Sequence, residues 1–197
     1  MKIILLCILA VAMIGLMVPS AYALEDKGDF SVSQADRNAT EKPPLNFDLT
    51  SLQREANNLW SWSARRTLSV AQELYDTHKL TTYPRTDSRF LPEDMMESIS
   101  KTIRQLGAQD KLNPHSQRLV DDGLKNVKRN FDNSKVSDHY AIIPTGKIPP
   151  SGLSSDASKL YELIARQFLA SFHPESVWKV EKRTASKQGQ NFVKEAR

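Results

Sequence analysis

Apolar residues recur at helical spacing along much of the chain, and polar capping residues precede several of these runs. We predict that Thr50 caps a first helix, because Gln53 stands three residues later and the pair has the form of a capping box. Ser63 is predicted to cap a second helix. The positions expected to face the core are Leu49, Leu52, Ala56 and Leu59 in the first helix and Ala64, Leu68, Ala71 and Tyr75 in the second. Tyr75 and Tyr161 both lie on such apolar stripes, so we expect both to be core residues rather than catalytic ones.

Three further helices are predicted toward the C-terminus. Pro92 suits the first turn of one, and Gly107 is expected to end it. Asn113 begins another, which Gly123 weakens in its middle, and Asp156 begins the last. The apolar faces predicted for the first and last of these helices consist of Met96, Ile99, Ile103 and Leu106, and of Leu160, Leu163, Ile164 and Phe168.

Extended segments are predicted around these helices. The apolar run 141–143, which ends at Pro144, is typical of a short buried strand. Residues 177–184 alternate between apolar and polar and are predicted to form a strand, and 191–193 is expected to begin another. Residues 24–44 are expected to form a loop or an irregular strand. A helical unit followed by the first strands of a sheet predicts an α+β fold that is predominantly helical.

Composition narrows the class of protein only a little. The chain has 197 residues, of which 40% are apolar and 25% charged, as in soluble globular proteins of one or two domains. A net charge of +4 permits an anionic partner without requiring one. Cys7 is the only cysteine, which excludes an intramolecular disulfide and a cysteine metal site. The histidines lack metal-ligand spacing, so we predict no metal bound by this chain alone.

Residues 1–23 form an apolar leader with two interpretations. Lys2, the apolar run 3–18 and Ala21-Tyr22-Ala23 together are typical of a secretory signal with a small-residue cleavage site. Taken alone, the leader predicts export or membrane tethering. The alternative is that truncation or rearrangement of a gene has joined the leader to part of a larger cytoplasmic protein. A polar lead-in, 24–46, follows the leader.

The segment 81–89 is the most informative part of the sequence for chemistry. It reads Thr-Thr-Tyr-Pro-Arg-Thr-Asp-Ser-Arg and combines a phenol with two guanidinium groups. Pro84 biases Tyr83 toward extended geometry, so the phenol is expected to project from the chain. Arg85 would then share a face with Tyr83, and its planar guanidinium suits phosphate oxygens. An ordinary proline turn with solvated charges is the alternative.

Three separated strings resemble one family. They are Pro-Pro-Leu-Asn-Phe-Asp-Leu-Thr-Ser-Leu-Gln-Arg-Glu-Ala at 43–56, the segment 81–89, and Ser-Asp-His-Tyr-Ala-Ile-Ile-Pro-Thr at 137–145. Together they resemble the tyrosine-bearing region of type IA DNA topoisomerases, and the bacterial topoisomerase III branch most closely. The resemblance extends from about Phe30 to the C-terminus.

The resemblance implies part of a multidomain toroid that cuts one DNA strand and passes another through the gap. Residues 47–150 would form its tyrosine-bearing catalytic domain, and 151–197 part of the adjoining DNA-binding and gate domains. Tyr83 would be the nucleophile that becomes linked to a 5′ phosphate, with Arg85 and His139 beside the same phosphate. By the same resemblance and by charge, the DNA-binding candidates are Ser51, Gln53, Arg65, Arg66, Thr86, Asp87, Ser88, Arg89 and Thr145.

Physical chemistry agrees with these roles. Attack on a phosphodiester concentrates negative charge on the non-bridging oxygens, which a guanidinium and an imidazole would stabilise. A neutral phenol is a poor nucleophile, and a nearby cation favours its phenolate form. Taken without the motif, His139 is instead interpreted as a structural histidine capping a strand.

The resemblance also sets expectations for cofactors, partners and location. Family members hold Mg²⁺ in an acidic domain that nothing in this sequence matches, so we expect Mg²⁺ only with that missing domain and expect the chain alone to be inactive. Single-stranded DNA is the expected partner, and the missing topoisomerase domains in trans are the second candidate partner. The expected location is the cytoplasm, at the nucleoid. The lack of a match to the metal-binding domain favours the truncation account of the leader. Membrane contact is expected only if the leader is retained. The alternatives are a non-catalytic single-strand-binding module that stacks bases on Trp60 or Trp62, and an exported protein of unrelated role.

Overall fold

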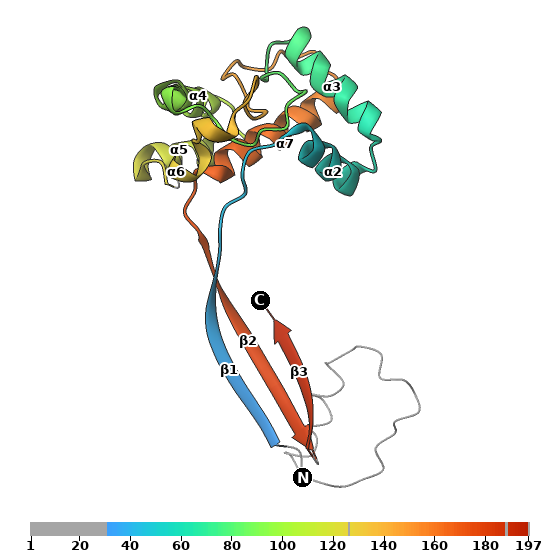
Figure 1. Cartoon of the computed structure of the whole chain (residues 1–197), viewed down its shortest axis with the longest axis vertical. Helices are drawn as coiled ribbons and strands as arrows, with labels where there is room; N and C mark the ends of the chain where they lie inside the picture. Colours follow the sequence, from blue (N-terminus) through green and yellow to red (C-terminus); the bar gives the residue numbers. More distant parts are fainter. Residues whose placement is uncertain (1–30, 126, 188, 197) are drawn as a thin grey trace. The chain divides into compact units, whose positions relative to one another are not determined.

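The computed structural model describes residues 31–125, 127–187 and 189–196, and it divides into two compact units (Figure 1). One unit runs from Asn38 to Trp178 and is mainly helical. The other consists, in its described part, of residues 31–37 with 179–187 and 189–196. The predicted leader, 1–23, lies outside the described residues.

The structure contains both helices and strands, and helices predominate, which confirms the predicted α+β class. The helices are α2 (Leu49–Trp60), α3 (Ala64–Asp76), α4 (Met96–Leu106), α5 (Asn113–Asp122), α6 (Val127–Asn130) and α7 (Ser155–Ser171), with 3-10 turns η1 (Glu93–Met95) and η2 (Asn133–Lys135). The strands are β1 (Ser31–Glu41), β2 (Ser176–Lys187) and β3 (Gln190–Ala196). They form a sheet in the order β1-β2-β3, in which β2 and β3 are antiparallel and Thr184 pairs with Val193. The strands predicted at 177–184 and 191–193 are therefore confirmed, and the lead-in forms a strand from Ser31.

Helix α2 begins earlier than the sequence predicted. Asp48, not Thr50, is its N-cap: the Asp48 carboxylate accepts from Ser51 N at 2.6 Å, and Asp48 N donates to Ser51 Oγ at 3.1 Å. This reciprocal pair gives both backbone amides, Asp48 N and Ser51 N, a hydrogen-bond partner. Thr50 and Gln53 have the same spacing in the sequence but are not the cap of the helix.

Helix α3 begins at its predicted cap but buries a different stripe. Ser63 Oγ accepts from Arg66 N, as expected for an N-cap. The buried residues are Thr67, Val70, Ala71 and Leu74, whereas the predicted positions Ala64 and Leu68 are exposed or half-buried. Thr67 Oγ1 donates to Ser63 O at 3.2 Å, so this polar side chain has a hydrogen-bond partner inside the core. Because threonine is polar, the hydrophobic pattern did not identify it as a buried position.

The helices α4 to α6 agree in most respects with the sequence-based prediction. Ile99, Ile103 and Leu106 are buried and Gly107 forms the C-cap of α4, as predicted, although Met96 is exposed. Gly123 interrupts the next predicted helix with a φ of 72°, which favours glycine, so that α5 and α6 are separate helices.

The predicted strand at 141–143 is instead a buried extended segment with isolated bridges. Its amides bond to three different places: Ala141 N donates to Phe90 O, Ile142 N to Phe47 O, and Ile143 N to Thr82 Oγ1. Pro144 follows and has no N–H to extend a ladder. The segment thus ties 47, 82 and 90 together through the core without belonging to a sheet.

Helix α7 passes between the α2–α3 pair and the α4–α6 group (Figure 1) and contacts both α3 and α5. Ser154 caps it, and the predicted face residues Leu160, Ile164 and Phe168 are fully buried. From the sequence, residues 151–197 are predicted to belong to adjoining domains, whereas the contacts of α7 lie within the unit that carries Tyr83. No helix in the described part of the chain is long and apolar enough to cross a membrane.

Candidate active site

Tyr83 opens onto a surface pocket of about 340 Å³. The pocket is lined by Tyr75, Lys79, Thr81, Thr82, Tyr83, His139, Tyr140 and Thr145. The centroid of the His139 ring lies 4.3 Å from that of the Tyr83 ring, with an angle of 45° between the planes. The structure therefore brings together Tyr83, His139 and Thr145, three of the residues that the sequence singled out.

Hydrogen bonds between distant parts of the chain place Tyr83 beside His139. Thr82, its neighbour, donates from N to Ile143 O at 3.0 Å and from Oγ1 to Ala141 O at 2.9 Å. Thr81 forms an antiparallel bridge with Pro144. These contacts fix the backbone on which the phenol stands to the segment that directly follows His139.

Beyond Tyr83, successive side chains alternate between the interior and solvent. Thr86 and Ser88 are buried, whereas Arg85 and Asp87 are exposed. Thr86 Oγ1 donates to His139 O at 3.1 Å, and Ser88 Oγ donates to Lys135 O at 2.7 Å. Two predicted DNA-binding hydroxyls are thus used inside the protein, one of them to hold the backbone of His139.

Arg85 is held by α3 and does not line the pocket. In the orientation of the Gln72 amide that pairs donors with acceptors, the amide oxygen accepts from Arg85 Nε at 3.1 Å and Nη2 at 3.2 Å. The expected shared face with Tyr83 is therefore not a direct contact around the pocket. Gln72 orients the guanidinium from one turn before Tyr75 on the same helix.

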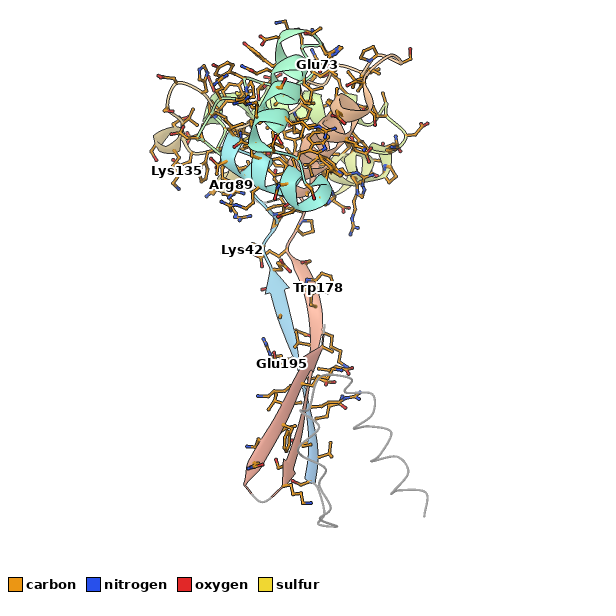
Figure 2. All side chains as sticks on the ribbon, turned by 90° about the vertical axis from the view of Figure 1, so that its right-hand side faces the viewer. Lys42, Glu73, Arg89, Lys135, Trp178 and Glu195 are labelled. Atoms are coloured by element: carbon orange, nitrogen blue, oxygen red, sulfur yellow. The ribbon has the colours of Figure 1, made fainter. Side chains whose placement is uncertain are left out.

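The other predicted DNA-binding residues are dispersed over the helical unit. Arg89, labelled in Figure 2, donates from Nε to Asn46 O at 3.0 Å. Gln53 Nε2 donates to Ala64 O at 3.1 Å, and Ser51 belongs to the cap of α2. Arg66 pairs with Asp156 at 2.6 Å, while Arg65 is exposed. The structure does not bring this group together around Tyr83.

Five residues that line the pocket were not predicted as site residues: Tyr75, Lys79, Thr81, Thr82 and Tyr140. Tyr75, expected in the core, is only half-buried, and its ring meets Tyr83 edge-on at a centroid distance of 5.4 Å. Tyr161, also expected in the core, is buried as predicted. The available signal for Tyr75 was its place at the end of α3, immediately before the segment 81–89.

Burial, and secondarily the nearby Tyr75, raises the pKa of Tyr140 above its ordinary value, so this phenol stays neutral at physiological pH. Lys79 contributes a cation, and the described residues that line the pocket include no aspartate or glutamate. The pocket therefore has the aromatic and cationic character that suits a phosphate group attached to a planar base.

The described residues offer no metal centre. Among them, no group of three or more His, Cys, Asp or Glu side chains could hold a metal ion. The residues around Tyr83 do not fit the Mg²⁺ that the resemblance implies for another domain, and no chemical step is assigned to a metal in this pocket.

Comparison with known proteins agrees with the three strings. A family model described as DNA topoisomerase matches residues 20–197. The chain is 45% identical over 142 residues to DNA topoisomerase 3 of Shouchella clausii, covering 70% of this chain and 19% of the relative. It is 41% identical over 154 residues to DNA topoisomerase 3 of Bacillus subtilis, covering 76% and 21%. The chain thus spans about a fifth of the length of these curated relatives.

A solved structure has the same fold. Full-length topoisomerase I from Thermotoga maritima superimposes with a TM-score of 0.55 at 25% sequence identity. The likeness covers 85% of this chain and 27% of that one.

Proposed function

Since this chain belongs to the type IA DNA topoisomerase family, we propose that it supplies the cleavage tyrosine of such an enzyme and that Tyr83 is this residue. Its substrate is single-stranded DNA in the cytoplasm. The reaction is reversible transfer of a phosphodiester from a sugar oxygen to the phenol.

The chemistry needs no energy source beyond the bond that is broken. The Tyr83 oxygen, having lost its proton, attacks phosphorus. A bond forms between the phenolic oxygen and this phosphorus, which stays attached to the 5′ oxygen of the following nucleotide, while the bond from phosphorus to the 3′ oxygen breaks. The 3′ oxygen leaves and takes up a proton. Because the phosphotyrosine ester retains the energy of the broken bond, the 3′ hydroxyl rejoins the strand by the reverse steps.

The observation that carries the proposal is the pairing of Tyr83 and His139 at one surface pocket. The two residues are separated by more than fifty positions, and neither is fully buried. An imidazole at this distance can hydrogen-bond a phosphate bound over the phenol and stabilise the charge that develops there. A histidine that only capped a strand would not need this ring contact with a solvent-accessible phenol.

We propose that Mg²⁺ acts together with a metal-binding domain of the kind that the family resemblance implies, and that such a domain is the second partner besides DNA. In support, no group of three or more His, Cys, Asp or Glu side chains among the described residues could hold the ion. Arg85, oriented by Gln72, is proposed to reach the scissile phosphate when DNA is bound.

The test is capture of the covalent intermediate. The full chain is incubated with labelled single-stranded DNA, Mg²⁺ and a separately made metal-binding domain of a relative, then quenched with detergent. We expect a protein–DNA adduct that Tyr83→Phe abolishes. Tyr161→Phe, whose hydroxyl instead bonds Gln109 and Lys147 O, is the matched control and should keep the adduct.

An adduct that survives Tyr83→Phe would falsify the assignment of the nucleophile. A non-catalytic module that only binds single strands predicts no adduct in any mixture. Stacking through Trp62 does not favour that alternative, because Trp62 is only 3% exposed and the Arg66 guanidinium carbon lies 4.7 Å from the centroid of its ring.

A further inference from the structure

Lys79 has an unusual backbone conformation for its residue type. Its φ is 54°, and Ser61 is the only other residue without a glycine's freedom that has positive φ in the described part of the chain. Side chains with a Cβ avoid this left-handed region, where glycine, asparagine and aspartate are favoured. Such outliers persist where the surrounding structure holds them, and they concentrate at functional sites.

The surroundings of Lys79 hold it firmly. Just after α3 ends, Leu80 N donates to Leu74 O at 2.9 Å. Thr145 Oγ1 donates to Lys79 O at 2.8 Å, and Thr145 N donates to Leu80 O at 3.0 Å. The left-handed turn thereby directs the chain from the helix into the segment of Tyr83, with Lys79 at the wall of the pocket.

The Lys79 ammonium group lies over the aromatic ring that contacts Tyr83. Lys79 Nζ is 5.2 Å from the centroid of the Tyr75 ring, which in turn meets the Tyr83 ring at 5.4 Å. Two lysines among the described residues of this unit form ion pairs: Lys111 with Glu162 at 2.9 Å and Lys135 with Asp132 at 2.8 Å. None of the ion pairs within 31–125, 127–187 and 189–196 involves Lys79. Its charge is available to an anion.

We propose that Lys79 is a phosphate-binding residue of this pocket, which holds a phosphate of the single-stranded DNA backbone next to the one that Tyr83 attacks. The inference rests on the proposed function, in which Arg85 reaches the scissile phosphate, and it assigns to Lys79 the neighbouring phosphate. Arg85 is occupied by Gln72 outside the lining, whereas Lys79 is the only lysine or arginine among the described lining residues.

The test measures DNA binding by the full chain at increasing KCl concentration, using fluorescence anisotropy of a fluorescein-labelled oligothymidylate. Each phosphate contact to a single strand contributes about 0.7 to the slope of log K against log salt. We expect Lys79→Gln to reduce the slope by about 0.7 and Lys79→Arg to retain it. Lys101→Gln, which removes an exposed lysine on α4, is the matched control and should leave the slope unchanged.

Lys79→Gly separates the charge from the backbone. Glycine adopts the left-handed conformation without the steric cost of a Cβ, so the unfolding midpoint should not fall, yet the salt slope should drop as in Lys79→Gln. A residue that served only to end α3 would not give this combination. A wild-type slope in Lys79→Gln or Lys79→Gly, or no salt-dependent binding by the wild-type chain, overturns the inference.

The two proposals fail independently. Tyr83→Phe is expected to abolish the covalent adduct while leaving the salt slope of binding at its wild-type value. Loss of slope in the Lys79 variants without any adduct in the wild-type chain would remove the cleavage proposal and support the phosphate contact.

Discussion

At the scale of single residues, the site depends on side chains whose partners come from other elements. Tyr83 and His139 were recognisable from their motifs, and their proximity is a property of the fold. Arg85 was also recognisable, but its position beside Gln72 was not, because an amide on a helix gives no sequence signal of which cation it faces. Lys79 was missed because a left-handed backbone at lysine cannot be foreseen from spacing.

Gln72 provides a test of how Arg85 is positioned. Gln72→Met keeps the volume and helix propensity but removes the acceptor of both guanidinium hydrogen bonds. We expect the rate of adduct formation to fall by about 10- to 100-fold, since small misplacements of a catalytic group have effects of that size.

Gln72→Glu, which keeps an acceptor oxygen at the same place, should restore much of the rate. Equal loss in both variants, or a lowered unfolding midpoint in Gln72→Met that accounts for the loss, would contradict a positioning role. The adduct yield and thermal unfolding of the same preparations provide the two measurements.

At the scale of elements, the sequence predicted where helices exist better than where they begin or which face they bury. All predicted helices are present, but α2 begins at the Asp48 cap and α3 buries a stripe that includes Thr67. Both errors come from polar side chains that bond the backbone locally, because such residues read as surface positions in a pattern of hydrophobicity. The run 141–143 was predicted as a strand from its apolar character, yet three separate segments share its amides.

The competition between Asp48 and Thr50 for the cap of α2 gives a sharp prediction. Asp48→Ala removes the acceptor of Ser51 N and should destabilise the chain by about 1 kcal/mol, or roughly 2–4 °C in unfolding midpoint for a chain of this size.

Thr50→Ala, in the first turn of the same helix and exposed, should change stability by less than about 0.5 kcal/mol. Urea unfolding followed by circular dichroism measures both variants. A larger loss in Thr50→Ala than in Asp48→Ala would mean that the capping box does not hold the start of α2.

At the scale of the whole molecule, α7 joins parts of the helical unit that are far apart in sequence. Gln167 Nε2 donates to Leu45 O at 2.7 Å, and Asn130 Nδ2 donates to Ser171 O at 2.8 Å. Lys125 N donates to Phe172 O at 3.0 Å. The predicted domain boundary at residue 150 rested on a proline-rich segment. Such a segment has the same composition whether the chain enters a new domain or returns to the same core, so these contacts could not be foreseen.

His173, at the end of α7, makes the stability of this unit depend on pH. Burial first, and then the nearby His115 and Arg118, lower the pKa of His173 below its ordinary value of 6.5, against an opposing effect of Asp122. The unfolded chain therefore binds a proton more readily than the folded one. Stability should be complete above about pH 7 and fall as the pH drops through 6.5.

His173→Gln removes this titration, so its unfolding midpoint should change less than that of the wild type between pH 7.5 and 5.5. Carboxylates such as Glu162, whose pKa is lowered chiefly by a hydrogen bond from Lys111, titrate below this window. Thermal unfolding at a series of pH values makes the measurement. Parallel pH profiles for the two proteins would exclude His173 as the source.

The fastening of Thr86 to the carbonyl of His139, and of Thr82 to Ala141, has a consequence for synthesis on the ribosome. These bonds span 53 and 59 residues, so a nascent chain that has emerged only as far as α5 carries the phenol without the imidazole. The contact between the Tyr83 and His139 rings therefore forms only after the second of these two segments has left the exit tunnel.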